Sequence, residues 1–382
     1  MNPDSLRSLL WRLGAGMLIL FMLQPHARAD TSTSAVLCEQ PWRAWQSFRN
    51  NLISAEGRVI DNSDPRQITT SEGQSYALFL ALVNDDREMF QRLLDWTEKN
   101  LAQGDLTRHL PAWLWGRQDN NDWGVLDDNP AADSDLWIAY SLLEAGRLWG
   151  VRQYTLYGHL LLQRIAREEM VTLPDHGAVL LPGKSGFVDD DGWRLNPSYV
   201  PPQLVARAAT ALPDSPWSEL NDNAVPFLID SAPLGIAPDW VVWDGQRWTY
   251  PGHQEQWASY NAIRVYLWTG MLSDDASQAR ELKAHFRQVQ DFIDQNGLPA
   301  ESLNVLGGEA RGEGPAGFSA ALLPLFGQDT FGESQRRRVE AIEFVSLGYY
   351  SQVLVLFGQG WDEHRFRFDD RGRVAPFWEG CP

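Results

Sequence analysis

The strongest constraint on the fold of this chain is a helical pattern of apolar residues that recurs along almost its whole length. Apolar residues return every three or four positions in about twelve separate segments, as expected for helices with one buried face. Several segments open on Ser, Asp or Pro, which favour a helix start. In chain order, the segments cover residues 40–53, 75–83, 88–101, 135–149, 151–170, 199–212, 216–231, 256–271, 276–295, 316–326, 332–344 and 349–357. The pattern predicts an all-α protein, in which six successive helical hairpins could close into a toroid with a cleft at one end.

Long connections separate some of these helices and are rich in Trp, Gly, Asp and Pro, as in residues 110–130 and 173–197. Long loops on a helical scaffold usually carry function. Asp244-Gly245 lies between two short β-prone runs, residues 241–243 and 247–250, and predicts a β-hairpin. No Ser/Gly-rich linker or low-complexity tract divides the chain, so a single domain over residues 30–382 is the simplest organisation.

The first 29 residues have the pattern of a signal peptide. Arg7 and Arg12 come before an apolar run over residues 13–23, and Ala27-Arg28-Ala29 fits the small-x-small rule of a cleavage site. We expect cleavage before Asp30 and a periplasmic or secreted product. No later segment approaches the roughly 18 uninterrupted apolar residues of a spanning helix, so no stable membrane insertion is expected.

The only two cysteines, Cys38 and Cys381, lie near opposite ends of the exported chain. Export places them in an oxidising compartment, where we expect them to form a disulfide. Two unpaired buried thiols are the alternative, because two positions alone make a weak pattern.

The formal net charge of the chain is -18. Such a surface repels polyanions, which makes nucleic acid, anionic lipid and uronate polymers poor partners and leaves neutral or cationic polymers open. A solvated acidic surface alone would also explain the charge.

Tryptophan is abundant, with 18 residues, and many of them fall outside the predicted helices. Indole rings stack on the C–H faces of a pyranose, while Asp, Asn and Arg bind its hydroxyl groups. Aromatic filling of a large core is the alternative for any one of them. Acidic residues cluster nearby, and glycoside cleavage needs paired carboxylates. The loop tryptophans are Trp113, Trp115, Trp123, Trp193, Trp240, Trp243 and Trp248.

Glu72 is the one side chain in the turn over residues 69–76 that can donate a proton to a leaving group. A helix start stabilises the anion, whereas a general acid must keep its proton. Desolvation in an aromatic cleft, or a second carboxylate such as Asp133, would favour the protonated form. Asp133 and Asp135 also precede a helix, and capping of that helix is their alternative role.

Other chemistries have little support. The seven histidines are dispersed, and neither a Gly-x-Ser-x-Gly elbow nor a phosphate-binding loop occurs. Residues 189–192 resemble part of a calcium-binding loop, but Phe187 and Ser198 occupy places where that loop requires acids. We therefore expect no metal and no cofactor.

Read together, several motifs resemble glycoside hydrolase family 8, in particular its periplasmic endoglucanase branch encoded beside bacterial cellulose synthases. The resemblance covers essentially the whole exported chain. The motifs are Thr-Ser-Glu-Gly-Gln-Ser-Tyr at 70–76, Pro-Ala-Trp-Leu-Trp-Gly at 111–116, Asp-Ser-Asp-Leu-Trp at 133–137, Asn-Pro-Ser-Tyr at 196–199, Ser-Tyr-Asn-Ala-Ile-Arg-Val-Tyr at 259–266 and Phe-Gly-Gln-Gly-Trp at 357–361.

The resemblance implies an (α/α)6 barrel with an open cleft that cleaves β-1,4-glucan internally with inversion. By motif, Glu72 resembles the proton donor. Asp133 resembles the residue often assigned as nucleophile, although gripping the sugar and helping Glu72 keep its proton suit an inverting reaction better. A β-1,4-glucan chain is the implied partner, and a cellulose-synthase complex is a second partner that stays open. Residues that resemble glucan-binding positions are Trp113, Trp115, Trp193, Tyr260, Arg264 and Tyr349.

The chain departs from the family pattern at two places. Ala131-Ala132-Asp133 lacks a hydroxyl that the signature usually has, and Asn261 replaces the aspartate that resembles the general base. A carboxamide cannot accept a proton from water, and loss of a general base costs about 10²- to 10⁴-fold in rate. Asp244 or Glu255 could substitute. Three functions follow: a slow endoglucanase, a glucan-binding pseudoenzyme, and a hydrolase of chitosan or xylan.

Overall fold

The structure, a computed structural model, describes residues 38, 41–250, 252, 256–293, 297–327 and 329–381. Within these residues it contains twelve α-helices, α2 to α13. The expected signal peptide over residues 1–29 lies outside the described residues. None of the described helices combines the length and the apolar character that crossing a bilayer requires.

Six helices form an inner ring in which each helix packs against the next. The first and last members also meet, because the rings of Phe79 and Phe357 stack with centroids 5.4 Å apart. All ten residues of α9 are buried, and every residue of α3 is buried except Glu72. The inner helices are α3 (Ser71–Val83), α5 (Ala132–Trp149), α7 (Pro202–Ala211), α9 (Ala262–Met271), α11 (Ala316–Phe326) and α13 (Tyr349–Asp362).

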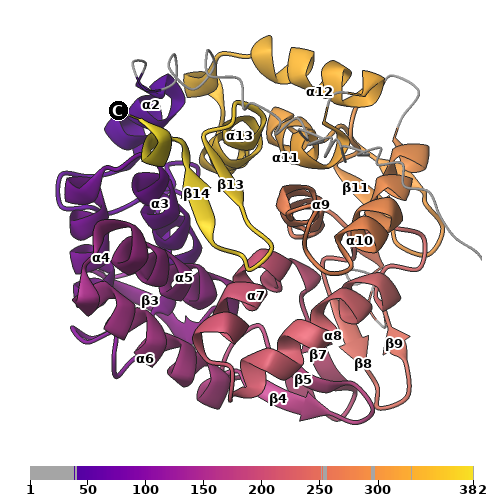
Figure 1. The fold of residues 1–382 in the computed structure, drawn as a ribbon, viewed down its shortest axis with the longest axis horizontal. Coiled ribbons are helices and arrows are strands. Elements are labelled where there is room, and N and C mark those ends of the chain that lie inside the picture. The colour runs from indigo at the N-terminus through magenta and orange to yellow at the C-terminus, as the bar shows by residue number, and fades with distance from the viewer. Residues whose placement is uncertain are drawn as a thin grey trace, which may run out of the picture.

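Six further helices lie outside this ring, each against one inner helix: α4 on α3, α6 on α5, α8 on α7, α10 on α9, α12 on α11 and α2 on α13. They bury one face only, as amphipathic surface helices do. The two rings make an (α/α)6 barrel, which confirms the expected fold (Figure 1). The outer helices are α2 (Arg43–Leu52), α4 (Arg87–Asn100), α6 (Arg152–Glu168), α8 (Pro216–Asp230), α10 (Ala279–Phe286) and α12 (Thr330–Glu340).

Several helix starts and ends differ from the prediction for local reasons. The hydroxyl of Thr70 accepts a hydrogen bond from the Gly73 amide, so α3 begins at Ser71 rather than at residue 75. The predicted helix over 256–271 is wrong at its start, because residues 257–258 pair in a sheet and α9 begins at Ala262. The predicted helix over 276–295 ends early: α10 stops at Phe286, and the 3-10 helix η2 (Arg287–Phe292) follows.

Short antiparallel sheets occupy the connections between helices. The predicted hairpin around Asp244-Gly245 is confirmed by the pairing of β8 and β9. Residues 110–130, expected to be a loop, contain a second hairpin of β2 and β3 that also pairs with β1. The strands are β1 (Thr69–Thr70), β2 (Ala112–Arg117), β3 (Trp123–Pro130), β4 (Met170–Leu173), β5 (Gly177–Leu180), β6 (Val188–Asp189), β7 (Gly192–Leu195), β8 (Val241–Trp243), β9 (Trp248–Thr249), β10 (Trp257–Ala258), β11 (Ser302–Asn304), β12 (Ala310–Arg311), β13 (Phe366–Phe368) and β14 (Val374–Pro376).

The β13–β14 hairpin covers the end of the ring at which α3 and α5 end (Figure 1). Phe366 packs edge-on against Phe79 with centroids 5.1 Å apart, and the Tyr140 hydroxyl donates to the Gly372 carbonyl at 2.8 Å. The hairpin therefore closes one end of the barrel and leaves the starts of α3 and α5 at the other end.

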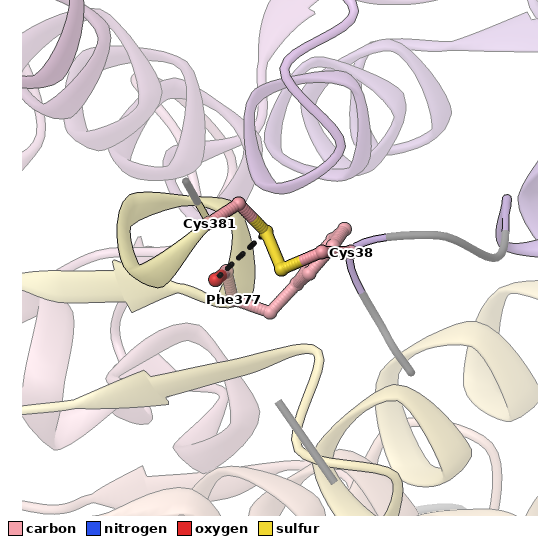
Figure 2. The surroundings of a disulfide bond; sticks show 3 residues. All are labelled: Cys38, Phe377 and Cys381. Atoms are coloured by element: carbon pink, nitrogen blue, oxygen red, sulfur yellow. Dashed lines mark hydrogen bonds between the residues drawn. A yellow bond between two sulfur atoms is a disulfide. The ribbon is translucent and has the colours of Figure 1, made fainter. Parts of the chain in front are cut away.

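The structure joins Cys38 and Cys381 in a disulfide, with Cα atoms 5.7 Å apart (Figure 2). Cys381 follows the 3-10 helix η4 (Phe377–Gly380), and the Phe377 carbonyl oxygen lies 3.8 Å from its Sγ. The bond links two positions 343 residues apart in the sequence.

Candidate active site

Glu72 lies at the start of α3, the inner helix that β1 leads into. Thr69 and Thr70 pair with β2, and the Thr70 hydroxyl caps the helix, so both strand and cap fix the first turn. Glu72 is the single residue of α3 that is not buried, and its side chain is 23 % exposed. The carboxyl is therefore accessible from outside the ring while its backbone is fixed.

Asp133 lies at the start of α5, next to Glu72 in space. Its Oδ1 accepts a hydrogen bond from the Ser134 amide at 2.7 Å, and its side chain is only 2 % exposed. The hydroxyls of Ser134 and Ser71 share a hydrogen bond of 2.6 Å, which ties the starts of the two inner helices together. The two carboxyls are thus brought together by the packing of α3 on α5.

Ala131 is the N-cap residue of α5, so neither Asp133 nor Asp135 is the cap itself; both lie in the first turn. Asp135 is fully buried. Burial raises the pKa of Asp135 well above its usual range, and the nearby Glu169 carboxyl raises it further.

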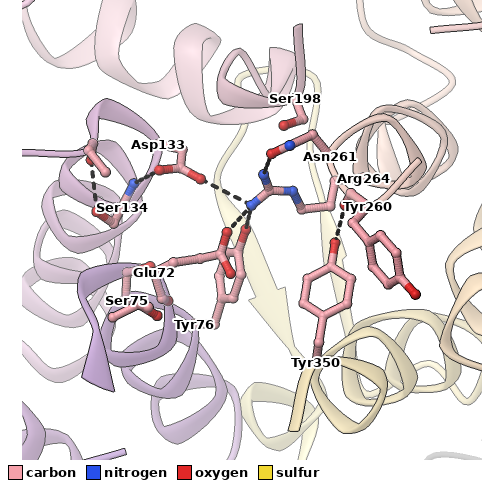
Figure 3. Close-up of polar contacts among 12 residues, drawn as sticks. Glu72, Ser75, Tyr76, Asp133, Ser134, Ser198, Tyr260, Asn261, Arg264 and Tyr350 are labelled. Atoms are coloured by element: carbon pink, nitrogen blue, oxygen red, sulfur yellow. Dashed lines mark hydrogen bonds and ion pairs between the residues drawn. The ribbon is translucent and has the colours of Figure 1, made fainter. Parts of the chain in front are cut away.

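Arg264, on α9, is the cation that links the cluster (Figure 3). Its Nη1 donates to Glu72 Oε2, to the Tyr76 hydroxyl at 2.9 Å and to Asp133 Oδ2 at 3.1 Å. Its Nη2 donates to Asn261 Oδ1 at 2.6 Å. One guanidinium therefore binds two carboxyls and fixes the side chain at position 261.

The surroundings of Asp133 shift its pKa towards neutral pH. Burial raises the pKa of Asp133 to about 7, against the attraction of Arg264 and with a further contribution from the Glu72 carboxylate. Burial would lower the pKa of Arg264, but Glu72, Tyr76 and Asp133 hold it above its usual value. Arg264 therefore stays charged while Asp133 can carry or release a proton near neutral pH.

Asn261 immediately precedes α9, and a second carboxylate lies against its backbone. Asp239 Oδ1 accepts hydrogen bonds from the amides of Ser259, Asn261 and Ala262. Burial raises the pKa of Asp239, although those three amides and Arg264 oppose the shift. Sequence analysis missed Asp239, because Ala237-Pro238-Asp239-Trp240 has no spacing that links it to residue 261.

The two residues considered as substitutes for a base do not join this cluster. Asp244 is exposed in the turn between β8 and β9, where its Oδ1 accepts from the amides of Gln246 and Arg247, each at 2.9 Å. Glu255 lies outside the described residues.

The expected glucan-binding aromatics differ in exposure. Trp113 is 36 % exposed and Tyr260 45 %, and the Tyr260 hydroxyl donates to Glu301. Trp115 is enclosed, since it stacks on Trp123 at 5.3 Å and meets Trp96 edge-on at the same distance.

The other expected binding residues lie deeper in the protein. Trp193 is half-buried and pairs with Trp243 between β7 and β8. Tyr349 is buried against α3, where a Cβ on Gly73 would come within 2.5 Å of the Tyr349 hydroxyl. Gly73 therefore gives Tyr349 the room to pack beside Glu72.

A cavity of about 620 Å³ lies away from this cluster. No Trp, Tyr or Phe lines it, and neither Glu72, Asp133 nor Arg264 is one of its lining residues. Within the described residues, no three His, Cys, Asp or Glu side chains are grouped as metal ligands. The Glu72–Asp133–Arg264 cluster is therefore the constellation best suited to acid–base chemistry.

A ring of paired helices that brings two carboxyls onto one guanidinium supplies the paired acids that a glycoside hydrolase needs. The chain belongs to family 8 of the glycosyl hydrolases, whose family model matches residues 24–364. It is 50 % identical over 338 residues to the endoglucanase of Escherichia coli (strain K12), covering 88 % of this chain and 91 % of that protein.

Solved structures agree with this assignment. The endo-1,4-D-glucanase from Vibrio fischeri ES114 matches with a TM-score of 0.84 and 46 % identity, over 88 % of this chain and 99 % of that one. The endo-beta-1,4-glucanase CMCax from Acetobacter xylinum has the same fold, with a TM-score of 0.70 and 24 % identity over 84 % of this chain and 98 % of that one.

Proposed function

We propose that the chain is an endo-β-1,4-glucanase that cuts β-1,4-glucan internally, with inversion at the anomeric carbon. The observation that carries the proposal is the meeting of Glu72 and Asp133 on Arg264 at the starts of α3 and α5. Relatives that share half of the residues are named as endoglucanases, which supports the same substrate class.

In this proposal, Glu72 donates the proton to the oxygen that leaves the anomeric carbon. Its partial exposure supports this role, because an acid must reach the bridging oxygen of a bound polymer. Asp133 is buried and has one oxygen on the shared guanidinium, which suits binding a sugar hydroxyl at the cleavage point. Arg264 keeps both carboxyls in place.

We also propose that Trp113 and Tyr260 stack on glucose rings, since their faces are the exposed ones. Trp115, Trp193 and Tyr349 are more enclosed, and their proposed contribution is to shape the walls of the cleft. Arg264 is only 3 % exposed in its side chain, so its proposed contribution to sugar binding is to position Glu72 and Asp133.

The proposal extends to location and organisation. Residues 1–29 would be removed after Ala29 on export to the periplasm or the medium, leaving one catalytic domain over residues 30–382, and the enzyme would act in cellulose production. N-terminal sequencing of the exported protein tests the first part: a start at Asp30 supports it, and an intact Met1 contradicts it.

The activity test compares two glutamates in the first turns of two helices. On a soluble cellulose derivative, Glu72→Gln should release reducing ends about 10²- to 10⁴-fold more slowly than wild type, because the general acid is lost. Glu88→Gln is the matched control, since Glu88 is in the first turn of α4 with its side chain 84 % exposed. Equal rates for wild type and Glu72→Gln would contradict the proposal. NMR of early product should find the α-anomer, as inversion requires.

A glucan-binding pseudoenzyme is the second candidate, and Asn261 is the observation that favours it. Its carboxamide lies where the family has a base and cannot accept a proton. This candidate predicts binding of cello-oligosaccharides by calorimetry without any reducing-end release over long incubation.

A further inference from the structure

Asp239 reaches the start of α9 from the loop that follows α8. Its Oδ1 accepts from the amides of Ser259 at 2.9 Å, Asn261 at 3.0 Å and Ala262 at 2.7 Å. Three amides on one oxygen fix the carboxylate against the backbone of Asn261. This helix start also carries Arg264, so Asp239 is bound to the element that carries the cation of the site.

A chain of direct contacts links Asp239 to Glu72. Asp239 binds the Asn261 amide, the Asn261 side chain binds Arg264, and Arg264 binds Glu72. Asn261 and Arg264 therefore connect the two carboxyls through direct hydrogen bonds. Inverting glycosidases need a gap of about 6.5–9.5 Å between their carboxyls, because a water must fit there.

The second oxygen of Asp239 is the one available for chemistry. The side chain is half-buried, and its Oδ2 is not a fully buried atom without a partner. No described residue donates a hydrogen bond to Oδ2, whereas Oδ1 receives three. One oxygen thus anchors the group while the other can bind water.

The charged and titratable groups around Asp239 are few. Arg264 acts on it electrostatically, and Asp239 in turn raises the pKa values of Tyr266 and Tyr350. Burial raises the pKa of Asp239 despite its three amide donors. A carboxylate with a raised pKa is a better proton acceptor near neutral pH than an ordinary aspartate.

We propose that Asp239 is the general base of this enzyme and accepts the proton of the attacking water in place of the missing aspartate at position 261. The inference rests on the proposed function. Asn261 donates a hydrogen bond from its amide nitrogen to the oxygen of that water. As the water oxygen bonds to the anomeric carbon, one water proton passes to Asp239, the glycosidic C–O bond breaks, and the proton of Glu72 goes to the departing oxygen. Exchange with solvent returns both carboxyls to their starting states.

The test uses Asp239→Asn with Asp244→Asn as matched control, because Asp244 also accepts backbone amides on one oxygen but lies exposed in the β8–β9 turn. Asp239→Asn should lower kcat about 10²- to 10⁴-fold and remove the acidic limb of the pH–rate profile. Azide should then restore turnover and yield the α-glycosyl azide, since an anionic nucleophile needs no base. Adding Asn261→Asp to this variant should recover at least about tenfold in kcat, because it supplies a new base.

Other results would overturn the inference. A loss of kcat below about tenfold with the acidic limb intact would do so. So would a large loss that neither azide nor Asn261→Asp relieves, because that pattern describes a residue that only positions α9.

If Asp239→Asn does not fold, Asn261→Asp in the wild-type background decides. A gain below about tenfold supports a working base elsewhere, and a gain of about 10²-fold or more means that the wild type lacks one. Wild type that is inactive, with Glu72→Gln no different, would instead mean that the proposed function itself fails.

Discussion

The two ends of α5 each carry a buried carboxylate, and their surroundings differ. At the start, Asp133 accepts one hydrogen bond from a backbone amide and one from Arg264, whose guanidinium also donates to Glu72. Near the end, Glu144 receives both Nε and Nη2 of Arg147, Nε of Arg207 and the Val374 amide.

The difference separates a structural carboxylate from one available for chemistry. Glu144 is fully buried and its two oxygens receive four hydrogen bonds, so nothing is left for a ligand. Asp133 shares its only cation, and its pKa is raised to about 7 by burial and by Glu72. A buried carboxylate with too few partners can change its protonation state or accept a substrate hydroxyl, while a saturated one fixes the fold.

The largest loss of stability is expected for a change at Glu144, near the end of α5. Glu144→Gln should lower the free energy of unfolding by about 3–5 kcal/mol, because two arginines lose their anionic partner. Chemical denaturation measures the loss, and the activity per folded molecule should stay close to that of wild type. Glu88→Gln, on the exposed face of α4, serves as the control and should change stability by less than about 0.5 kcal/mol. A Glu144→Gln variant that is stable but inactive would contradict the assignment of Glu144 as a structural carboxylate.

A smaller, pH-dependent effect on stability is expected for a change at Asp133, at the start of α5. The pKa of Asp133 in the folded protein, about 7, is higher than its ordinary value of 3.8. This group therefore stabilises the fold most below pH 4, and the contribution is lost as the pH rises towards 7. Relative to Asp133→Asn, the wild type should lose on the order of 2–4 kcal/mol between pH 4 and pH 8.

Denaturant titrations at several pH values test this shift. Ser141→Ala, on the same helix, removes no titratable group, and its difference from wild type should not vary with pH. If the difference in stability between wild type and Asp133→Asn also does not vary with pH, Asp133 is a structural carboxylate like Glu144.

The smallest loss of stability is expected for Arg147, the more exposed of the two arginines that bind Glu144. Arg147 is 31 % exposed in its side chain and Arg207 is 12 % exposed. Water can replace part of the lost contact at Arg147, so Arg147→Gln should cost about 1 kcal/mol, less than Arg207→Gln. Thermal unfolding of both variants compares them, and a reversed order would show that exposure does not rank these two contacts.

Much of the fold could be predicted from periodicity. The helix expected over residues 316–326 coincides with α11, because a continuous apolar run between Pro315 and Gly327 has clear limits. The run over residues 256–271 misled, because Trp257-Ala258 reads as apolar helix while its backbone pairs with β11. Such pairing depends on a segment some forty-five residues further along the chain, which no local pattern reveals.

The site was partly visible in the sequence. Glu72 and Asp133 carry recognisable neighbours, and the structure brings them to one guanidinium. Asp239 could not be found in this way, because its three amide contacts exist only when the loop after α8 folds back on the start of α9. Glu144 was missed for a similar reason, since its partner Arg207 is on another helix and the Val374 amide is near the end of the chain.

The bond between Cys38 and Cys381 turns the described chain into a covalent circle. A single protease cut in any surface loop of that circle would leave every helix attached to every other one. Without a reducing agent, a once-nicked protein should therefore run as one band of full mass on a denaturing gel, and should separate into two pieces only after the thiols are freed.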